Sequence, residues 1–372
     1  MSIGGSSPPN WNSPGAIISP SIMVGSSSLE GIWSDIDCTK RHASILCSLG
    51  TDNSHPSSFR NLRAASLRDG HRGSFMSTSG SISGQDLKNA PHRGNIMGLG
   101  YSIFVRPMLG LMDSEKAHRR ALLGLRVASF TFFGRLLLRV LYKPRKIESS
   151  CIGLNFNNPL GIAAGMDKKA EAMRGWETLG FGFIEVGGIT ELEQSGNPKP
   201  RMFRSAKHGA LINRMGFNNP GSKKMAMHLA KASKPSVPLF LNVGKSKATD
   251  IENAHFDYAK TVERCGAYVD GIVINVSSPN TPNLRELQKD EELSRIISAV
   301  KLHSGSKPVL IKIAPDLEDM QIRSIVDTAR ELGCAGIVAT NTTVERPEET
   351  GVMLETGGLS GKPLRSRSTQ II

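Results

Sequence analysis

The sequence predicts an α/β protein: a (β/α)8 TIM barrel, of which about six βα units are present, preceded by a small amphipathic helical domain. From residue 151 onward, short apolar runs rich in β-branched residues alternate with longer helical stretches, a pattern typical of parallel sheets. Polar residues follow nearly every run at its carboxyl end, where a barrel places its site. The first run lacks the glycine fingerprint of an open dinucleotide-binding sheet, so a barrel is favoured.

Composition excludes several classes of protein. The five cysteines are scattered and lack zinc-ligand spacing, so we predict neither a disulfide framework nor a metal site. No run reaches about 18 uncharged apolar residues, the minimum for a membrane-spanning helix. The net charge of +13 is concentrated in residues 101–150, which hold ten Lys and Arg against three Asp and Glu. The high pI is therefore a local property, and we predict no nucleic-acid partner.

Residues 1–100 are predicted to form a disordered, low-complexity extension. Serine, glycine and proline are frequent there, and apolar residues rarely recur with the period of a strand or a helix. Arginines spaced by serines, from Arg60 to Arg72, are compatible with a mitochondrial targeting peptide, whereas Glu30, Asp35 and Asp37 argue against one. A targeting segment, a plain extension and a true start near Met97 remain open alternatives.

Residues 101–143 are predicted to form a pair of amphipathic helices. Two apolar segments, 101–112 and 117–142, flank a short polar stretch in which Ser114 is the expected N-cap of the second helix. Leucines and phenylalanines alternate with five arginines along that second segment. Such a basic, aromatic-rich pattern is typical of helices that lie in a membrane interface. A helical hairpin packed on the following domain fits the pattern equally well.

The barrel domain is assigned to residues 151–372. Its six predicted strands are Leu160–Ala163, Phe183–Val186, Leu239–Val243, Ile272–Val276, Val309–Ile313 and Ile337–Ala339. Crossover helices are predicted within 292–302 and 317–332. About 30 residues follow the sixth strand, including a turn-like stretch at 357–361, whereas two more βα units need roughly 60. We therefore expect the C-terminal barrel strands, whose loops commonly bind phosphate, to be missing.

The strand ends carry the candidate site residues. Lys168 and Lys312 close the first and fifth strands, and two converging cations indicate an anionic ligand such as a carboxylate, a phosphate or a reduced flavin; the alternative is that they face solvent. The segment 275–281 packs two Asn, two Ser and a Thr behind the fourth strand, which also fits a simple turn. The amide-rich segment 213–219 suits a planar ligand with several hydrogen-bonding edges, or a structured turn.

These strings together resemble one family, the class 2 dihydroorotate dehydrogenases, which are membrane-associated and quinone-dependent. The resemblance runs over residues 101–372, in family order. Its matching strings are 158–168, 196–201, 212–218, 242–245, 275–281, 312–317, 340–343 and 356–361. No single string would be specific, but the whole set is.

The resemblance implies an activity and a cofactor. The family oxidises dihydroorotate to orotate in de novo pyrimidine (UMP) synthesis, with FMN as hydride acceptor and ubiquinone as final electron acceptor. It assigns the catalytic base to Ser278. The substrate-binding residues it implies are Lys168, Asn213, Arg214, Met215, Gly216, Phe217, Asn275, Asn280, Asn341 and Thr342. The cofactor-binding residues it implies are Ala164, Gly165, Lys168, Gly188, Asn242, Asn275, Lys312, Thr340 and Gly361.

The resemblance also favours the membrane interpretation of residues 101–143, since family members use such helices to enter one leaflet and form a quinone tunnel. His118 and Arg204 match tunnel positions. It implies attachment to the mitochondrial inner membrane in a eukaryote or the cytoplasmic membrane in a bacterium. Gly188 and Asn283 depart from the family pattern, which usually has a hydroxyl residue that touches the flavin and a glycine, respectively.

Two other functions stay open from the sequence. Without its last strands, the chain could be a non-catalytic, membrane-associated remnant that holds no FMN. Another flavin barrel acting on pyrimidines would leave the helix pair without a purpose.

Overall fold

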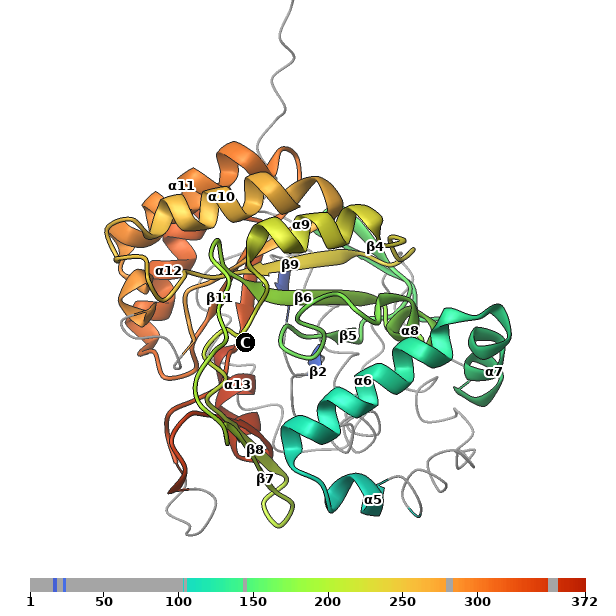
Figure 1. Ribbon diagram of the computed structural model, residues 1–372. Coiled ribbons are helices and arrows are strands. Elements are labelled where there is room, and N and C mark those ends of the chain that lie inside the picture. The colour runs from blue at the N-terminus through green and yellow to red at the C-terminus, as the bar shows by residue number, and fades with distance from the viewer. Residues whose placement is uncertain are drawn as a thin grey trace, which may run out of the picture.

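A curled sheet of parallel strands, wrapped by helices, forms the centre of the computed structural model (Figure 1). The structure describes residues 16–18, 23–24, 103, 106–142, 146–278, 284–346 and 354–372. The six strands predicted for the barrel are present as β5 (Gly161–Ile162), β6 (Phe183–Ile189), β9 (Leu239–Val243), β10 (Gly271–Asn275), β11 (Val309–Ile313) and β12 (Gly336–Ala339). They lie in the order β12-β11-β10-β9-β6-β5, and each neighbouring pair is parallel. The predicted partial TIM barrel is confirmed.

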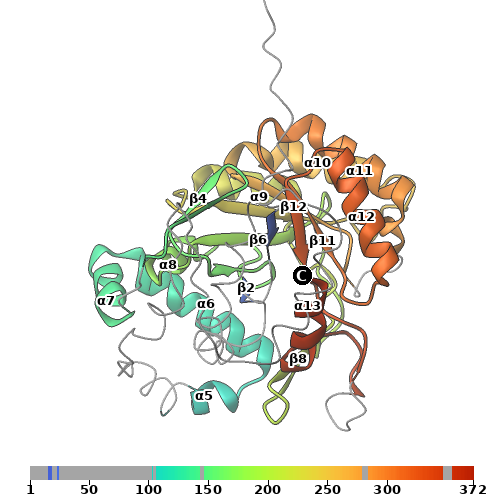
Figure 2. The ribbon, with the colours of Figure 1, turned by 180° about the vertical axis from the view of Figure 1, so that it is seen from behind.

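Helices between consecutive strands cover the outside of this sheet, as right-handed β/α crossovers require. They are α8 (Met173–Thr178), α9 (Gly221–Lys231), α10 (Ala254–Cys265), α11 (Asp290–Ser304) and α12 (Asp319–Glu331), with short 3-10 turns η3 (Gly266–Tyr268) and η4 (Leu284–Gln288). Helices α11 and α12 contain the two crossover segments predicted from the sequence. Figure 2 shows α10, α11 and α12 following the outer arc of the sheet from behind.

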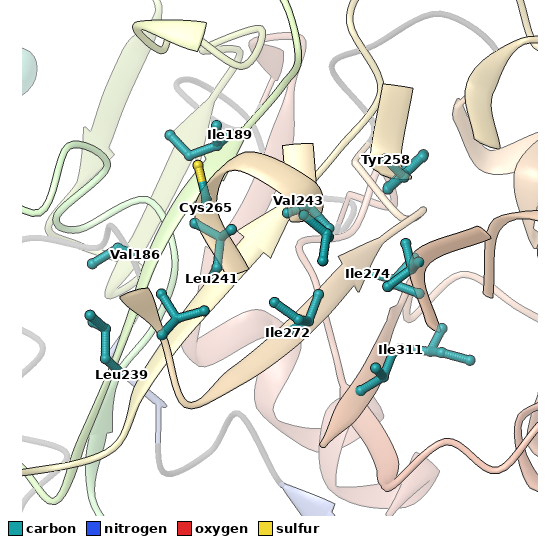
Figure 3. Packing of buried hydrophobic residues seen from close by; sticks show 14 of the residues in the cluster. Val186, Ile189, Leu239, Leu241, Val243, Tyr258, Cys265, Ile272, Ile274 and Ile311 are labelled. Atoms are coloured by element: carbon teal, nitrogen blue, oxygen red, sulfur yellow. The ribbon is translucent and has the colours of Figure 1, made fainter. Parts of the chain in front are cut away.

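Successive strand residues point to opposite faces of the sheet and enter two separate cores. Val186, Leu241, Ile272 and their equivalents face the helices and join one large cluster with Tyr258 and Cys265 (Figure 3). The alternate residues form a smaller cluster of Phe156, Ala163, Phe183, Phe240, Val273, Leu310 and Val338. Phe183 meets Phe156 and Phe240 edge-to-face, with ring centroids 5.8 Å and 6.0 Å apart. This second cluster fills the barrel interior.

Two small antiparallel sheets accompany the barrel. The hairpin of β3 (Ser149–Cys151) and β4 (Leu154–Phe156) brings Phe156 to the interior cluster. A three-stranded sheet has the order β13-β8-β7, with β7 (Met202–Ser205), β8 (Ala210–Asn213) and β13 (Gly358–Gly361). The interpretation of 357–361 as a turn was wrong, because Gly358–Gly361 pairs with Asn213–Ala210 of β8. The chain then ends in η6 (Lys362–Leu364) and α13 (Arg365–Ile371).

The helical segment differs from its prediction in three details. Its described helices are α5 (Arg106–Gly110), α6 (Ser114–Phe130) and α7 (Phe132–Tyr142). The expected first helix is thus present only as the short α5 within the described residues. The N-cap of α6 is Asp113, not Ser114: its carboxylate accepts a hydrogen bond from the Lys116 amide at 3.0 Å. The predicted single helix over 117–142 is broken at Thr131.

Side chains at the break stabilise both helix ends. The Thr131 hydroxyl accepts the Gly134 amide at 3.0 Å and so caps α7. The Arg135 guanidinium donates to the carbonyls of Ser129 and Phe130 at 3.0 and 3.1 Å, which otherwise lack helical partners at the end of α6. Among the described residues no single helix is long and apolar enough to cross a membrane, but α6 and α7 pass that test as a pair bent by 112°.

Two glycines in these helices give opposite expected results when changed to alanine. A Cβ on Gly134 would lie 1.9 Å from the Ala128 carbonyl oxygen, whereas a Cβ on Gly124 meets nothing within 4 Å. We expect Gly134→Ala to lower the free energy of unfolding by about 1–3 kcal/mol through overpacking, and Gly124→Ala to raise it by about 1 kcal/mol through helix propensity. Urea denaturation measures the free energy of unfolding of both variants. If Gly134→Ala stabilised the protein as much as Gly124→Ala, the result would contradict the bend between α6 and α7.

Two short N-terminal strands pair with the edges of the barrel sheet. Strand β1 (Ala16–Ile18) lies parallel to β12, and β2 (Met23–Val24) lies parallel to β5. The other residues of the predicted disordered extension, 1–15, 19–22 and 25–100, lie outside the described residues. The assignment of residues 1–100 to such an extension stays a prediction.

Candidate active site

A polar layer lies directly above the apolar interior of the barrel. Because side chains on one face of a strand recur every second residue, the residues two positions beyond the interior cluster enter the same space. Phe183, Phe240, Val273, Leu310 and Val338 are followed in this way by Glu185, Asn242, Asn275, Lys312 and Thr340. All five are buried, with exposed fractions of 0–6%. The carboxyl ends of the strands therefore converge on one polar site, as the sequence predicted.

Hydrogen bonds join the polar layer across the strands. The Asn341 amide donates to Asn275 Oδ1 at 3.3 Å, and the Asn275 amide donates to Asn242 Oδ1 at 3.1 Å. The Asn242 amide donates in turn to Glu185 Oε1 at 2.6 Å. These bonds link the ends of β12, β10, β9 and β6, and all of them run in one direction. The Glu185 carboxylate sets that direction, because within this series it alone can accept hydrogen bonds but not donate them.

Glu185 is the site residue that the sequence analysis missed. Its fully buried carboxylate receives the Ala164 amide at 3.1 Å and lies 3.3 Å from Lys312 Nζ. A buried carboxylate needs such partners, because an unpaired one would be strongly destabilising. The signal was present: a charged residue inside the apolar run Phe183–Val186 predicts a buried partner.

Lys168 lies in the loop that follows β5, four residues beyond Ala164, whose amide contacts Glu185 of the layer. Its ammonium donates to Asn218 Oδ1 at 2.5 Å. Removal from water, assisted by the nearby positive charge of Arg201, lowers the pKa of Lys168 to about 7, against the opposing influence of Glu115. A lysine that half-titrates near neutrality inside a polar site is a candidate for binding an anion.

Ser278 follows β10 by three residues and is buried. The preceding Ser277 hydroxyl donates to Asn275 Oδ1 at 3.0 Å and accepts the Asn341 amide at 3.0 Å. The serine segment is therefore hydrogen-bonded to the series of Asn341, Asn275 and Asn242 side-chain amides, which we call the amide chain of the polar layer. Asn280, predicted to bind substrate, lies outside the described residues, as does Asn283.

The predicted substrate segment 213–217 begins at the end of β8. Asn213 and Met215 are buried, and Gly216 and Phe217 have positive φ values of 69° and 48°. The Arg214 guanidinium donates to Glu355 at 2.7 Å and to the Thr356 carbonyl at 3.2 Å, and it stacks on Phe203 with its Cζ 4.4 Å from the ring centroid. These contacts connect β8 to the segment before β13.

The remaining predicted cofactor residues lie in, or just beyond, four different strands. The Thr340 hydroxyl is 2.8 Å from that of Ser368 on α13, which brings the C-terminal helix to the polar layer. Gly188 sits in β6 where the register with β9 shifts, and a Cβ there would lie 2.4 Å from the Phe217 ring. Gly165 follows β5 with a φ of 97° and donates its amide to the Gly187 carbonyl. Gly361 ends β13 with the same φ and pairs with Ala210. Thr342, which was predicted to bind substrate, accepts a hydrogen bond from Arg285 at its carbonyl, at 3.5 Å.

The two predicted tunnel residues lie where the helices meet the barrel. His118 is in the first turns of α6, and burial, together with the charge of Lys168, lowers its pKa to about 4 against the influence of Glu115, so its imidazole is neutral at pH 7. Arg204 is in β7, which packs against α6, and a Cβ placed on Gly110 of α5 would lie 4.0 Å from Arg204 Nη1. In the part of the chain that the structure describes, no cluster of three or more His, Cys, Asp or Glu side chains could hold a metal ion.

A parallel β/α barrel with buried amides, a lysine and a serine at its strand ends defines a TIM-barrel enzyme site. Residues 146–372 match the dihydroorotate dehydrogenase family. Similar proteins include the dihydroorotate dehydrogenase (quinone) of Gloeobacter violaceus, 48% identical over 72% of this chain and 76% of the relative, and that of Chloroflexus aurantiacus, 41% identical over 74% and 80%. The chain belongs to the dihydroorotate dehydrogenase family.

A solved structure agrees with this assignment. The dihydroorotate dehydrogenase of Eimeria tenella, in a crystal with ferulenol, superimposes with a TM-score of 0.63 at 38% identity. The match covers 70% of this chain and 75% of that one. The relative of Mycobacterium tuberculosis, also a dihydroorotate dehydrogenase (quinone), is 46% identical over 72% of this chain.

Proposed function

We propose that this protein is a quinone-dependent dihydroorotate dehydrogenase, which oxidises dihydroorotate to orotate in pyrimidine synthesis. The observation that carries the proposal is the polar layer of five strand-end residues, set in a chain of that family. A flat pyrimidine with an amide edge and a carboxylate matches the donors present there. Lys168 supplies a cation, and Asn275 and Asn341 supply amides.

The donor set also fits FMN, which when bound would supply a hydride acceptor for the substrate and an electron donor for a quinone. Lys312 has three protons, and Glu185 accepts at most two of them, so at least one is left for a carbonyl or ring nitrogen of the flavin. A cation held there by a buried carboxylate would stabilise negative charge on the reduced ring. We assign Asn242, Asn275, Lys312 and Thr340 to that ring.

We assign the general base to Ser278, which takes the proton from C5 of the substrate. An alcohol is a weak base at neutral pH, so its own proton must leave as it acts. That proton is then relayed outward to solvent, to which Ser278 retains an exposed fraction of 9%. The Ser277 hydroxyl, hydrogen-bonded to Asn275 and Asn341, holds the backbone beside Ser278 in place.

We further propose that α6 and α7 attach the protein to a membrane and admit ubiquinone. Large apolar side chains are exposed along both helices, namely Leu123, Val127, Phe130, Phe132, Phe133, Leu136, Leu137, Val140 and Leu141. The arginines between them would meet anionic head groups, each contributing about 1 kcal/mol. His118 and Arg204 then lie at the inner end of the quinone path. In a eukaryote this membrane would be the mitochondrial inner membrane.

The experiment that tests the function uses the full chain with added FMN. We expect a yellow protein whose flavin absorbance is bleached by dihydroorotate without oxygen and restored by a short-chain ubiquinone. A colourless chain that retains no FMN would overturn the proposal in favour of the non-catalytic alternative.

The pH dependence of orotate binding follows from Lys168. Its free-state pKa is about 7, and a bound carboxylate favours the charged lysine and raises that pKa. Affinity should therefore be constant below about pH 7 and fall about tenfold per pH unit above it, until the bound-state pKa is reached. Calorimetry in buffers of different ionisation enthalpy should detect proton uptake on binding above pH 7. A flat profile would contradict this role of Lys168.

A further inference from the structure

A buried ion pair joins the helix segment to the barrel. Glu115, in the first turn of α6, accepts two hydrogen bonds from Arg201: Nε to Oε2 at 3.1 Å and Nη2 to Oε1 at 2.8 Å. Arg201 is 6% exposed, and the Glu115 side chain is 19% exposed. Such a two-point pair fixes the orientation of both groups as well as their separation.

The same guanidinium also holds the loop before β7. Its Nη1 donates to the carbonyls of Ser195 and Asn197, each at 2.9 Å. The Arg201 carbonyl accepts the Arg214 amide at 2.9 Å, and the Asn197 amide donates to the Met215 carbonyl at 3.1 Å. Arg201 thus connects α6 to the amide-rich segment that continues to Asn218, the partner of Lys168.

The pair also sets the electrostatic surroundings of Lys168. The charged and titratable groups that act on Lys168 are Arg201 from the barrel and Glu115 and His118 from α6, while Lys199 lies 3.6 Å from the Glu115 carboxylate. Burial alone would raise the pKa of Glu115, but the hydrogen bonds and charge of Arg201 hold it below its ordinary value. Glu115 is therefore an anion at neutral pH and offsets part of the positive charge around Lys168.

We propose that Glu115 and Arg201 are positioning residues that hold the start of α6 on the barrel and tune Lys168 for an anionic substrate. The proposal rests on the proposed function, since it takes orotate as the anion. It makes the helix segment a part of the substrate site through charge, in addition to its contact with the membrane.

The sign of the pH shift distinguishes this role from a merely structural one. Glu115→Gln removes a negative charge and leaves Arg201, so Lys168 should lose its proton at lower pH. Arg201→Gln removes a positive charge and leaves Glu115, so Lys168 should keep its proton to higher pH. A purely structural contact would be broken by both changes, with no opposite shifts. Arg201→Lys keeps the charge and loses the two-point contact.

The test measures orotate affinity by calorimetry across a pH series that brackets 7, using the full chain and each variant. We expect the midpoint to move down by about one pH unit in Glu115→Gln and up by about one unit in Arg201→Gln, with little change in Arg201→Lys. Amide hydrogen exchange of α6 should be faster in all three variants. Glu193→Gln, which breaks the exposed pair with Lys224, is the matched control and should alter neither readout.

Midpoints that move in the same direction, or not at all, would overturn the tuning of Lys168. Unchanged exchange of α6 in the three variants would overturn the positioning role. If the parent chain bound no orotate at any pH, the proposed function would fail, and the exchange measurement would still decide whether this pair holds the helix.

Discussion

Replacing Ser278 with alanine is expected to lower the rate of flavin reduction by dihydroorotate at neutral pH by roughly 10²- to 10⁴-fold, the usual contribution of a general base. The hydroxyl is buried at the end of β10, beside the amide chain of the polar layer. Orotate affinity should change little, because the anion is assigned to Lys168 and the Asn275 and Asn341 amides. Stopped-flow measurement of flavin bleaching separates this step from reoxidation by the quinone.

Two further variants distinguish the base from a packing role. Ser278→Cys should retain part of the rate and gain activity as pH rises toward the thiol pKa of about 8.5, because the thiolate can act as a base. Ser304→Ala removes a hydroxyl that is also buried and that donates to the Lys301 carbonyl of its own helix. Equal losses of the flavin reduction rate in Ser278→Ala and Ser304→Ala would show that the loss comes from packing and not from proton removal.

The six barrel strands could be predicted because the runs are apolar on both faces. All six predicted strands lie in the sheet, since a parallel strand covered on both sides leaves a continuous signal in the sequence. The sheet of β7, β8 and β13 was missed because it joins residues near 205 to residues near 360, and short strands with glycines at their ends resemble turns. The break at Thr131 was missed because both helices share one apolar pattern and only capping bonds separate them.

The candidate site was predictable only as far as strand ends reveal it. Lys312, Asn242 and Asn275 lie at the carboxyl-terminal ends of predicted runs and Thr340 follows one, and the structure brings them into one layer. Glu185 holds the same penultimate position in its run, but it was overlooked because its counter-charge, Lys312, lies 127 residues further along the chain. The pairing of Glu115 with Arg201, 86 residues apart, depends on how α6 packs on the barrel, and no local pattern specifies that.

Removal of the Lys312 ammonium has the largest expected effect on stability. Lys312 Nζ lies 3.3 and 3.4 Å from the two oxygens of the fully buried Glu185. Lys312→Met would leave that carboxylate without its counter-charge, and losing one partner of a buried pair costs about 3–5 kcal/mol. We expect this loss in urea denaturation, together with loss of bound FMN, because the same ammonium is assigned to the flavin ring.

The companion change shows whether the charge or the shape of Lys312 is required. Glu185→Gln combined with Lys312→Met removes both charges, so the double variant should recover much of the stability that the single variant loses. It should not recover FMN, since no cation then faces the ring. Lys234→Met, which breaks the partly exposed pair with Asp270, should cost less than about 1 kcal/mol. A Lys312→Met chain as stable as Lys234→Met would mean that the buried pair contributes no net stability, and that the polar layer is held by its amide chain alone.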